Sequence, residues 1–250
     1  MIDLTNLNDK QKEAVLTTDG PLLVLAGAGS GKTKVLTTRI AYLIEEKNIS
    51  PFHILAITFT NKAAKEMQER LFKLIGEVAR NIQVSTFHSF GLKLLRENYE
   101  LCGLDRNFNI IDSDDVLSII KKIMKNNNID PKKFSSYAIR NKISFIKNEL
   151  LSDAELDKFF NTEFDKMVKD IYYKYQSILV ESNVVDFDDL LAKPVILFRD
   201  HKEVLDHYQD IFKYILVDEY QDTNAVQYKL TKLLSNKYKN IFVVGDMNQS

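Results

Sequence analysis

Eight residues near the start of the chain, Ala26-Gly27-Ala28-Gly29-Ser30-Gly31-Lys32-Thr33, have the types and spacing of a phosphate-binding loop. They follow an apolar run, Leu22–Leu25, that is typical of a buried strand, and a helical pattern continues over Lys34–Glu46. A strand, a glycine-rich turn and a helix start direct several backbone N–H groups at one point, and the helix dipole adds positive potential there. We therefore predict that all eight residues bind the phosphates of a nucleotide. Ala26 replaces the glycine that usually opens this pattern, and its small side chain fits the same place.

Two side chains of this loop supply chemistry that the backbone lacks. The Lys32 ammonium is expected to contact the β- and γ-phosphates, and the Thr33 hydroxyl is expected to ligate Mg²⁺. The alternative is a glycine-rich turn that only begins a helix.

A second pair of chemical groups follows the apolar strand Ile215–Val217. Parallel strands bind ligands beyond their carboxyl ends, so Asp218 and Glu219 are expected beside the phosphate loop. We predict that Asp218 holds Mg²⁺ through water and that Glu219 orients and deprotonates the attacking water. The alternative is an acidic pair that caps a surface strand.

The strand Ile241–Val244 repeats this arrangement. Gly245 and Asp246 follow it, and Gln249 comes three residues later. An uncharged amide near the γ-phosphate distinguishes ATP from ADP without adding charge. We therefore predict Gln249 as a catalytic residue together with Lys32, Asp218 and Glu219.

The elements that position these groups alternate between strands and helices at both ends of the chain. Strands are predicted at Leu22–Leu25, Ile54–Phe59, Ile82–Ser85, Tyr214–Val217 and Ile241–Val244, with helices near Lys32–Glu46, Asn61–Ile75 and Ala225–Leu234. This rhythm indicates an α/β fold with a parallel sheet. The middle of the chain is mostly helical, so we predict a discontinuous sheet domain at residues 1–87 and 211–250, interrupted by a helical inserted domain at residues 88–210.

The composition excludes an internal disulfide and a membrane-spanning segment. The chain has 250 residues, 45% hydrophobic and 28% charged, which is typical of globular proteins with room for two domains. Cys102 is the single cysteine, which excludes an internal disulfide and favours a cytoplasmic location. No apolar run approaches the roughly 20 residues that span a bilayer, so no membrane association is predicted.

The net charge of −1 gives no support to nucleic-acid binding, but one segment departs from it. Residues 121–147 hold eight basic residues against one acidic residue. Two interpretations stay open: a solvated helical face, or an electrostatic track for a phosphate backbone.

Taken together, the motifs resemble the UvrD/Rep/PcrA-type DNA helicases of superfamily one. The matching segments occur in the family's order over nearly the whole chain: Leu7–Val15, Ala26–Thr33, Ala56–Ala64, Ser85–Ser89, Asp186–Leu190, Val217–Asn224 and Val244–Ser250. The resemblance implies a RecA-like domain that hydrolyses ATP with Mg²⁺, translocates on single-stranded DNA, with 3′-to-5′ polarity, and unwinds duplex DNA. It also implies that this chain is an N-terminal piece, because the family's second RecA-like domain and its arginines lie in later sequence.

The resemblance assigns further residues. By it, Gln11 reads the adenine edge, against the alternative of a capped surface turn. Phe59, Thr60 and Asn61 contact single-stranded DNA, with Phe59 stacking on a base, whereas a strand-end phenylalanine is otherwise a core residue. Thr86 and His88 form a second DNA contact, or His88 is a satisfied, partly buried histidine. Phe187 matches a second base-stacking position, and the aspartates around it are read as an acidic first turn of a helix.

Two other functions share parts of this pattern. One is a nucleotide-gated DNA-binding module without unwinding activity. The other is a small-molecule kinase built on the same phosphate loop, which requires an acceptor pocket and gives Phe59 no role.

Overall fold

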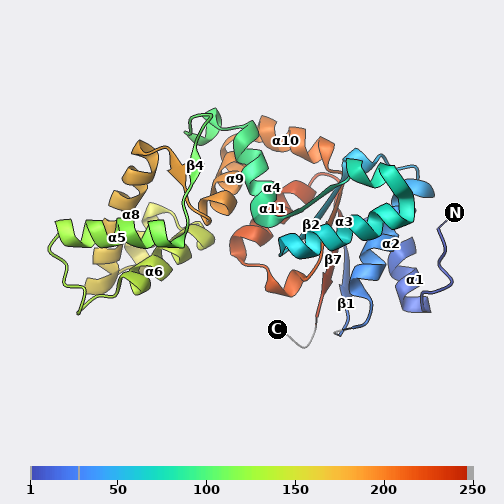
Figure 1. Cartoon of the computed structure of the whole chain (residues 1–250), viewed down its shortest axis with the longest axis horizontal. Helices are drawn as coiled ribbons and strands as arrows, with labels where there is room; N and C mark the ends of the chain where they lie inside the picture. Colours follow the sequence, from blue (N-terminus) through green and yellow to red (C-terminus); the bar gives the residue numbers. More distant parts are fainter. Residues whose placement is uncertain (1, 28, 247–250) are drawn as a thin grey trace. The chain divides into compact units, whose positions relative to one another are not determined.

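The computed structural model describes residues 2–27 and 29–246, and these residues form two compact units. The sheet unit comprises Met1–Phe90 and Phe198–Ser250, and the helical unit comprises Gly91–Leu197. Figure 1 shows β1, β2 and β7 in the first unit and the helices α5, α6 and α8 in the second.

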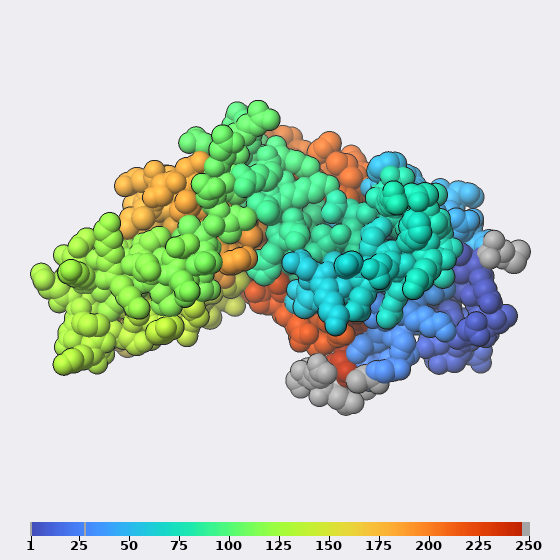
Figure 2. All heavy atoms as spheres, viewed as in Figure 1, coloured from blue at the N-terminus to red at the C-terminus, as the bar shows by residue number. Residues whose placement is uncertain are grey.

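The sheet unit is built on a five-stranded sheet whose neighbouring strands all run parallel. Its order is β1-β7-β6-β2-β3, with bounds β1 (Leu22–Leu25), β2 (Ile54–Thr58), β3 (Gln83–Thr86), β6 (Tyr214–Val217) and β7 (Asn240–Gly245). The last strand is therefore inserted beside the first, and in Figure 2 the red C-terminal residues lie against the blue N-terminal ones. The predicted α/β fold is confirmed. All five carboxyl ends meet at one edge, which brings the phosphate loop, Asp218 and Asp246 onto adjacent strands.

Helices cover both faces of this sheet. On one face, α2 and α3 bury Leu36 and Met67 against Leu216 and Phe242 of the sheet. On the other face, α11 packs against β6. The bounds are α1 (Asp9–Leu16), α2 (Lys32–Glu45), α3 (Asn61–Ile75), α10 (Lys202–Ile211) and α11 (Ala225–Ser235), with short turns η1 (Pro51–His53), η2 (Gly76–Asn81) and η4 (Tyr220–Asp222).

The helical unit has its own core. Ile120, Ile143, Val168 and Ile171 are at most 2% exposed and pack together between its helices. The bounds are α5 (Ser113–Asn126), α6 (Ser136–Glu149), α7 (Asp153–Phe159) and α8 (Glu163–Glu181), with η3 (Glu100–Cys102) and a parallel pair of short strands, β4 (Asn109–Ile110) and β5 (Val184–Val185). The borders of the unit fall inside α4 (Phe87–Glu97) and α9 (Asp189–Asp200).

The second border differs from the predicted one. The sequence placed the return to the sheet domain at residue 211, whereas the sheet unit resumes at Phe198. The reason is the packing of α10, because the Tyr208 ring lies 5.7 Å from Phe198 and 6.5 Å from Phe212. Gln209 also donates a hydrogen bond to the Leu233 carbonyl of α11 at 2.7 Å. The helical pattern of α10 carried no sign of which unit it joins.

A buried arginine connects three elements of the sheet unit. Arg39 on α2 is 2% exposed, and its guanidinium lies 4.6 Å from the centre of the Phe242 ring on β7. It donates hydrogen bonds to the carbonyls of Ala14 at 2.7 Å, Thr18 at 3.1 Å and Thr17, all at the end of α1. Burial lowers the pKa of Arg39 to about 10, so the side chain stays charged at neutral pH.

We predict that Arg39→Met lowers the free energy of unfolding by about 3 kcal/mol, because three carbonyls lose their donor in a buried place. Urea unfolding of the 250-residue chain measures this. The matched control is Arg80→Met, since Arg80 lies 5.7 Å from the Phe72 ring but its side chain is 69% exposed. The control is expected to change the free energy by less than about 0.5 kcal/mol. Equal losses for the two variants would contradict this role of Arg39.

Candidate functional site

The predicted phosphate loop connects β1 to α2 and has the backbone that such a loop needs. Gly29 and Gly31 have φ of +74° and +83°, in the left-handed region that favours glycine. Gly31 is the N-cap of α2, and a Cβ there would lie only 3.2 Å from the Gln11 amide nitrogen. The first backbone N–H groups of α2 therefore follow directly after the loop. Ala28, also predicted to bind phosphate, lies outside the described residues.

Lys32, the first residue of α2, points into a cluster of oxygens. Its side chain is 9% exposed, and Nζ lies 3.3 Å from Asp246 and 3.9 Å from Glu219. It also donates a long hydrogen bond of 3.4 Å to the Ala26 carbonyl. The Lys32 ammonium is therefore within 4 Å of one acid at the end of β6, Glu219, and one at the end of β7, Asp246.

Thr33 and Asp218 come together as the predicted metal pair. The Thr33 hydroxyl donates to the Asp218 carboxylate at 3.2 Å. Burial raises the pKa of Asp218 and the neighbouring charge of Glu219 adds to this, while the hydrogen bond from Thr33 opposes it. A hydroxyl and a carboxylate are the hard oxygen ligands that Mg²⁺ uses beside phosphate and water, so these residues fit that ion.

Glu219 is held in an unusual backbone conformation. Its φ is +51°, a left-handed value that is uncommon for a non-glycine residue and often marks a functional site. Its side chain is 41% exposed, and its carboxylate accepts a 2.7 Å hydrogen bond from the Gln221 amide. The amide oxygen of Gln221 in turn accepts from the Asp246 N–H at 2.9 Å. Gln221 thus joins the ends of β6 and β7, a role that sequence reasoning missed, because nothing distinguishes a polar residue in a turn.

Lys32, Thr33, Glu219 and Asp246 line one cavity of about 410 Å³ in the sheet unit. Its walls also include Arg70 of α3, a residue that sequence reasoning missed because it is one of several charged residues on that helix. The lining residues are Gly29, Gly31, Lys32, Thr33, Lys34, Arg70, Glu219, Asp222 and Asp246.

Gln11 lies beside the loop, in the first turn of α1. Its amide oxygen accepts from the Asn8 N–H at 2.9 Å, its own N–H donates to the Asn8 side chain at 2.9 Å, and its amide nitrogen donates to the Ser30 carbonyl at 2.9 Å. The capped turn that was the alternative is therefore present, and it also ties Gln11 to the phosphate loop. The spacing of Asn8 and Gln11 is a capping box, a signal from which α1 was predictable.

The predicted DNA-contacting segment follows β2. Phe59 is partly buried, and its ring meets that of Phe87 edge-on at 5.4 Å. Thr60 caps α3 by accepting from the Ala63 N–H at 3.1 Å, and Asn61 is exposed at the first position of that helix. The end of β2 thus presents one aromatic ring and two polar side chains.

Thr86 and His88 lie at the start of α4. Thr86 is 6% exposed, and its hydroxyl oxygen accepts from the Ser89 N–H at 3.1 Å while contacting the Ser89 hydroxyl at 3.0 Å. This places Thr86 as a helix cap rather than as a surface group. His88 is partly buried.

Phe187 belongs to the helical unit, where it is 51% exposed. It lines a cavity of about 190 Å³ together with Arg140, Asn141 and Ser144. Gln249, predicted as a catalytic residue, lies outside the described residues.

The basic stretch is not uniformly solvated. Lys147 is 4% exposed and forms ion pairs with two aspartates, so it belongs neither to a solvated face nor to a phosphate track. Lys142 pairs with Asp165 at 3.1 Å. The net charge available for DNA is therefore lower than the count of residues implied.

Two kinds of feature are absent from the part of the chain that the structure describes. Among residues 2–27 and 29–246, no helix has the length and apolar character needed to cross a membrane. The same residues contain no group of three or more histidine, cysteine, aspartate or glutamate side chains arranged to hold a metal ion.

Comparison with known proteins places these motifs in context. The chain matches the family described as UvrD/REP helicase N-terminal domain over residues 7–250. Proteins named ATP-dependent DNA helicase PcrA from Staphylococcus aureus (strain Mu50) and Bacillus subtilis (strain 168) are each 52% identical over 247 residues. These alignments cover 99% of this chain but only 34% and 33% of the relatives. The chain thus spans about a third of the length of the curated relatives it matches.

Proposed function

The chain belongs to the UvrD/REP helicase family, and we propose that it forms the ATP-binding part of a DNA helicase that couples ATP hydrolysis to movement along single-stranded DNA. The observation that carries this proposal is the convergence of Lys32, Glu219 and Asp246 within 3.9 Å at neighbouring strand ends, beside Thr33 and Asp218. The proposed setting is the cytoplasm, and the proposed partners are single-stranded and duplex DNA and a second RecA-like domain.

We propose the following roles for the residues around the nucleotide. Lys32 binds the β- and γ-phosphates, for which it must leave Asp246. Thr33 and Asp218 hold Mg²⁺, which neutralises phosphate charge when bound. Glu219 orients the attacking water and takes its proton, and Gln221 keeps that carboxylate in place. Gln11 recognises the base from its position against Ser30, and Gln249 senses the γ-phosphate.

The DNA contacts are proposed at the ends of β2 and β3 and in the helical unit. Phe59 and Phe187 stack on bases, and Thr60, Asn61 and His88 contact the backbone. Thr86 supports His88 by capping α4. A backbone hydrogen bond from the Asp218 N–H to the Ile57 carbonyl, 3.0 Å long, links the proposed metal pair directly to β2, which Thr58 ends and Phe59 follows. This bond gives a short path by which nucleotide state reaches DNA.

We predict that Phe59→Ala lowers the affinity for oligo(dT) about tenfold and removes DNA stimulation of ATP hydrolysis, because one stacking contact is lost. Hydrolysis is measured in a chimera in which this chain replaces the matching segment of the Bacillus subtilis relative. The control is Phe72→Ala, which truncates an exposed aromatic ring on α3. A Phe59 variant that still responds to DNA would favour the kinase alternative. Strand displacement by the chimera separates a helicase from a DNA-binding module that never unwinds.

A further inference from the structure

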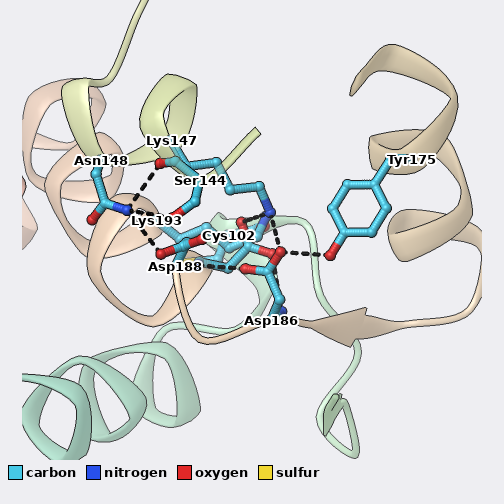
Figure 3. Close-up of polar contacts among 9 residues, drawn as sticks. Cys102, Ser144, Lys147, Asn148, Tyr175, Asp186, Asp188 and Lys193 are labelled. Carbon is cyan, nitrogen blue, oxygen red and sulfur yellow. Dashed lines mark hydrogen bonds and ion pairs between the residues drawn. The ribbon is translucent and has the colours of Figure 1, made fainter. Parts of the chain in front are cut away.

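A buried ionic cluster surrounds the position of Phe187 in the helical unit. The ion cluster consists of Lys147, Tyr175, Asp186 and Asp189. Lys147 Nζ lies 2.7 Å from Asp186 and 2.9 Å from Asp189, and the Tyr175 hydroxyl donates to Asp186 at 2.6 Å. Figure 3 shows Asp186 between the lysine and the tyrosine. Each of the four side chains is almost entirely buried.

The charges in this cluster depend on one another. Burial opposes ionisation of Asp186, but the Lys147 ammonium and the hydrogen bonds from Lys147 and Tyr175 hold its pKa below the ordinary value. Burial raises the pKa of Asp189, and the charge of Asp186 adds to that effect. Burial likewise disfavours the charged form of Lys147, yet the two aspartates raise its pKa overall. The ammonium is therefore the group that keeps the two carboxylates together.

The cluster fixes the backbone on both sides of Phe187. The Asp186 N–H donates to the Asp189 carboxylate at 3.2 Å, and the Asp189 N–H donates to the Asp186 carboxylate at 2.9 Å. Asp188, which directly follows Phe187, accepts a 2.8 Å hydrogen bond from the Asn148 amide, as Figure 3 also shows. Phe187 is thus the exposed member of a segment whose other three residues are held by hydrogen bonds.

Stability alone does not explain why such charges are buried. Apolar residues of similar volume usually stabilise a core as well as a buried ion pair does, because ions lose their hydration. A phenylalanine ring that is half exposed also lacks the stabilisation that full burial would give. The arrangement instead holds the Phe187 ring in one solvent-exposed position, at the wall of the cavity that Arg140 and Asn141 also line.

We propose that the ion cluster is a positioning device that holds Phe187 outward and ready to stack on an unpaired base of single-stranded DNA. This rests on the proposed function of Phe187. Lys147, Tyr175 and Asn148 are positioning residues: they act through Phe187 and do not touch the DNA. Holding the ring in place before binding reduces the conformational entropy lost on binding.

The test is a double-mutant cycle on the 250-residue chain. Tyr175→Phe removes one hydrogen bond to Asp186 and keeps the ring that fills the core. Asn148→Ala releases Asp188 and is the second variant. Both are made in the original chain and in Phe187→Ala, and binding to oligo(dT) that contains a single 2-aminopurine is followed by anisotropy and by quenching of the 2-aminopurine fluorescence.

We expect Phe187→Ala to weaken binding about tenfold and to reduce the quenching. Tyr175→Phe and Asn148→Ala are each expected to weaken binding about threefold and reduce the quenching in the original chain, and to have no further effect in Phe187→Ala. The matched control is Tyr173→Phe, on the same helix as Tyr175. It removes a 2.6 Å hydrogen bond from the Tyr173 hydroxyl to Asp153 and is expected to change neither the affinity nor the quenching.

Each other outcome decides a question. If Tyr175→Phe and Asn148→Ala weaken binding equally in both backgrounds, or in neither, the ion cluster only stabilises the fold and the proposal is overturned. If Phe187→Ala binds as the original chain does, or the original chain does not bind oligo(dT), the proposed function of Phe187 fails, and the positioning role fails with it. Lys147→Met gives a further arm, with thermal unfolding measured alongside, because it leaves two buried carboxylates without a cation.

Discussion

Lys32→Ala is expected to lower ATP turnover by the chimera about 10²–10³-fold and to weaken ATP binding by the 250-residue chain. Lys32 Nζ lies within 4 Å of both Asp246 and Glu219, so its charge acts at the point where the strand ends meet. Removing a single charged donor from a reacting centre typically costs this much. Binding is measured with a fluorescent ATP analogue and turnover by phosphate release.

The control for this variant is Lys10→Ala, whose side chain is 91% exposed and pairs with Glu13 on α1. It is expected to match the original chain in both assays. Circular dichroism belongs in the same experiment, because Lys32→Ala removes the 3.3 Å ion pair of Asp246, a residue that is 3% exposed. A folded Lys32→Ala chain that hydrolyses ATP at the original rate would show that the phosphates bind elsewhere.

Much of this site was predictable because it depends on strand ends. The bounds of β1 and β6 match the predicted strands, since short apolar runs followed by glycine or carboxylates define where a parallel strand stops. Once the strands are parallel, their carboxyl ends must share an edge, and the approach of Thr33 to Asp218 follows. The sheet order itself, with β7 between β1 and β6, needed the structure.

Contacts between distant residues were not predictable. Lys147 was counted with a basic segment, yet its partners lie 39 and 42 residues away and bury its charge. The aspartates around Phe187 were interpreted as an acidic helix start, and Asp189 does begin α9, but the pattern contained no sign of the lysine that pairs with Asp186 and Asp189. Gln221 and Arg70 were missed for the same reason, because a polar side chain gains its role only from what the fold brings beside it.

Glu219→Gln is expected to separate ATP binding from hydrolysis. The amide keeps the shape of the side chain and can still contact Gln221, but it cannot accept the proton of the attacking water, so turnover should fall about 10²–10⁴-fold. ATP affinity should stay within about threefold, because Lys32, Thr33 and the loop backbone, which bind the phosphates, are unchanged. Single-turnover hydrolysis by the chimera and equilibrium binding to the chain measure the two quantities.

Gln221→Leu gives the graded comparison for this role. It leaves the Glu219 carboxylate chemically intact but removes its 2.7 Å hydrogen bond and the link to the Asp246 N–H. If Glu219 is the base and Gln221 positions it, Gln221→Leu should lower turnover about tenfold, and the double variant should be no slower than Glu219→Gln alone. Additive losses would mean that Gln221 acts on the nucleotide by itself. An unchanged rate in Glu219→Gln would show that hydrolysis does not need a proton acceptor at position 219. Glu219 would then have no role in the mechanism.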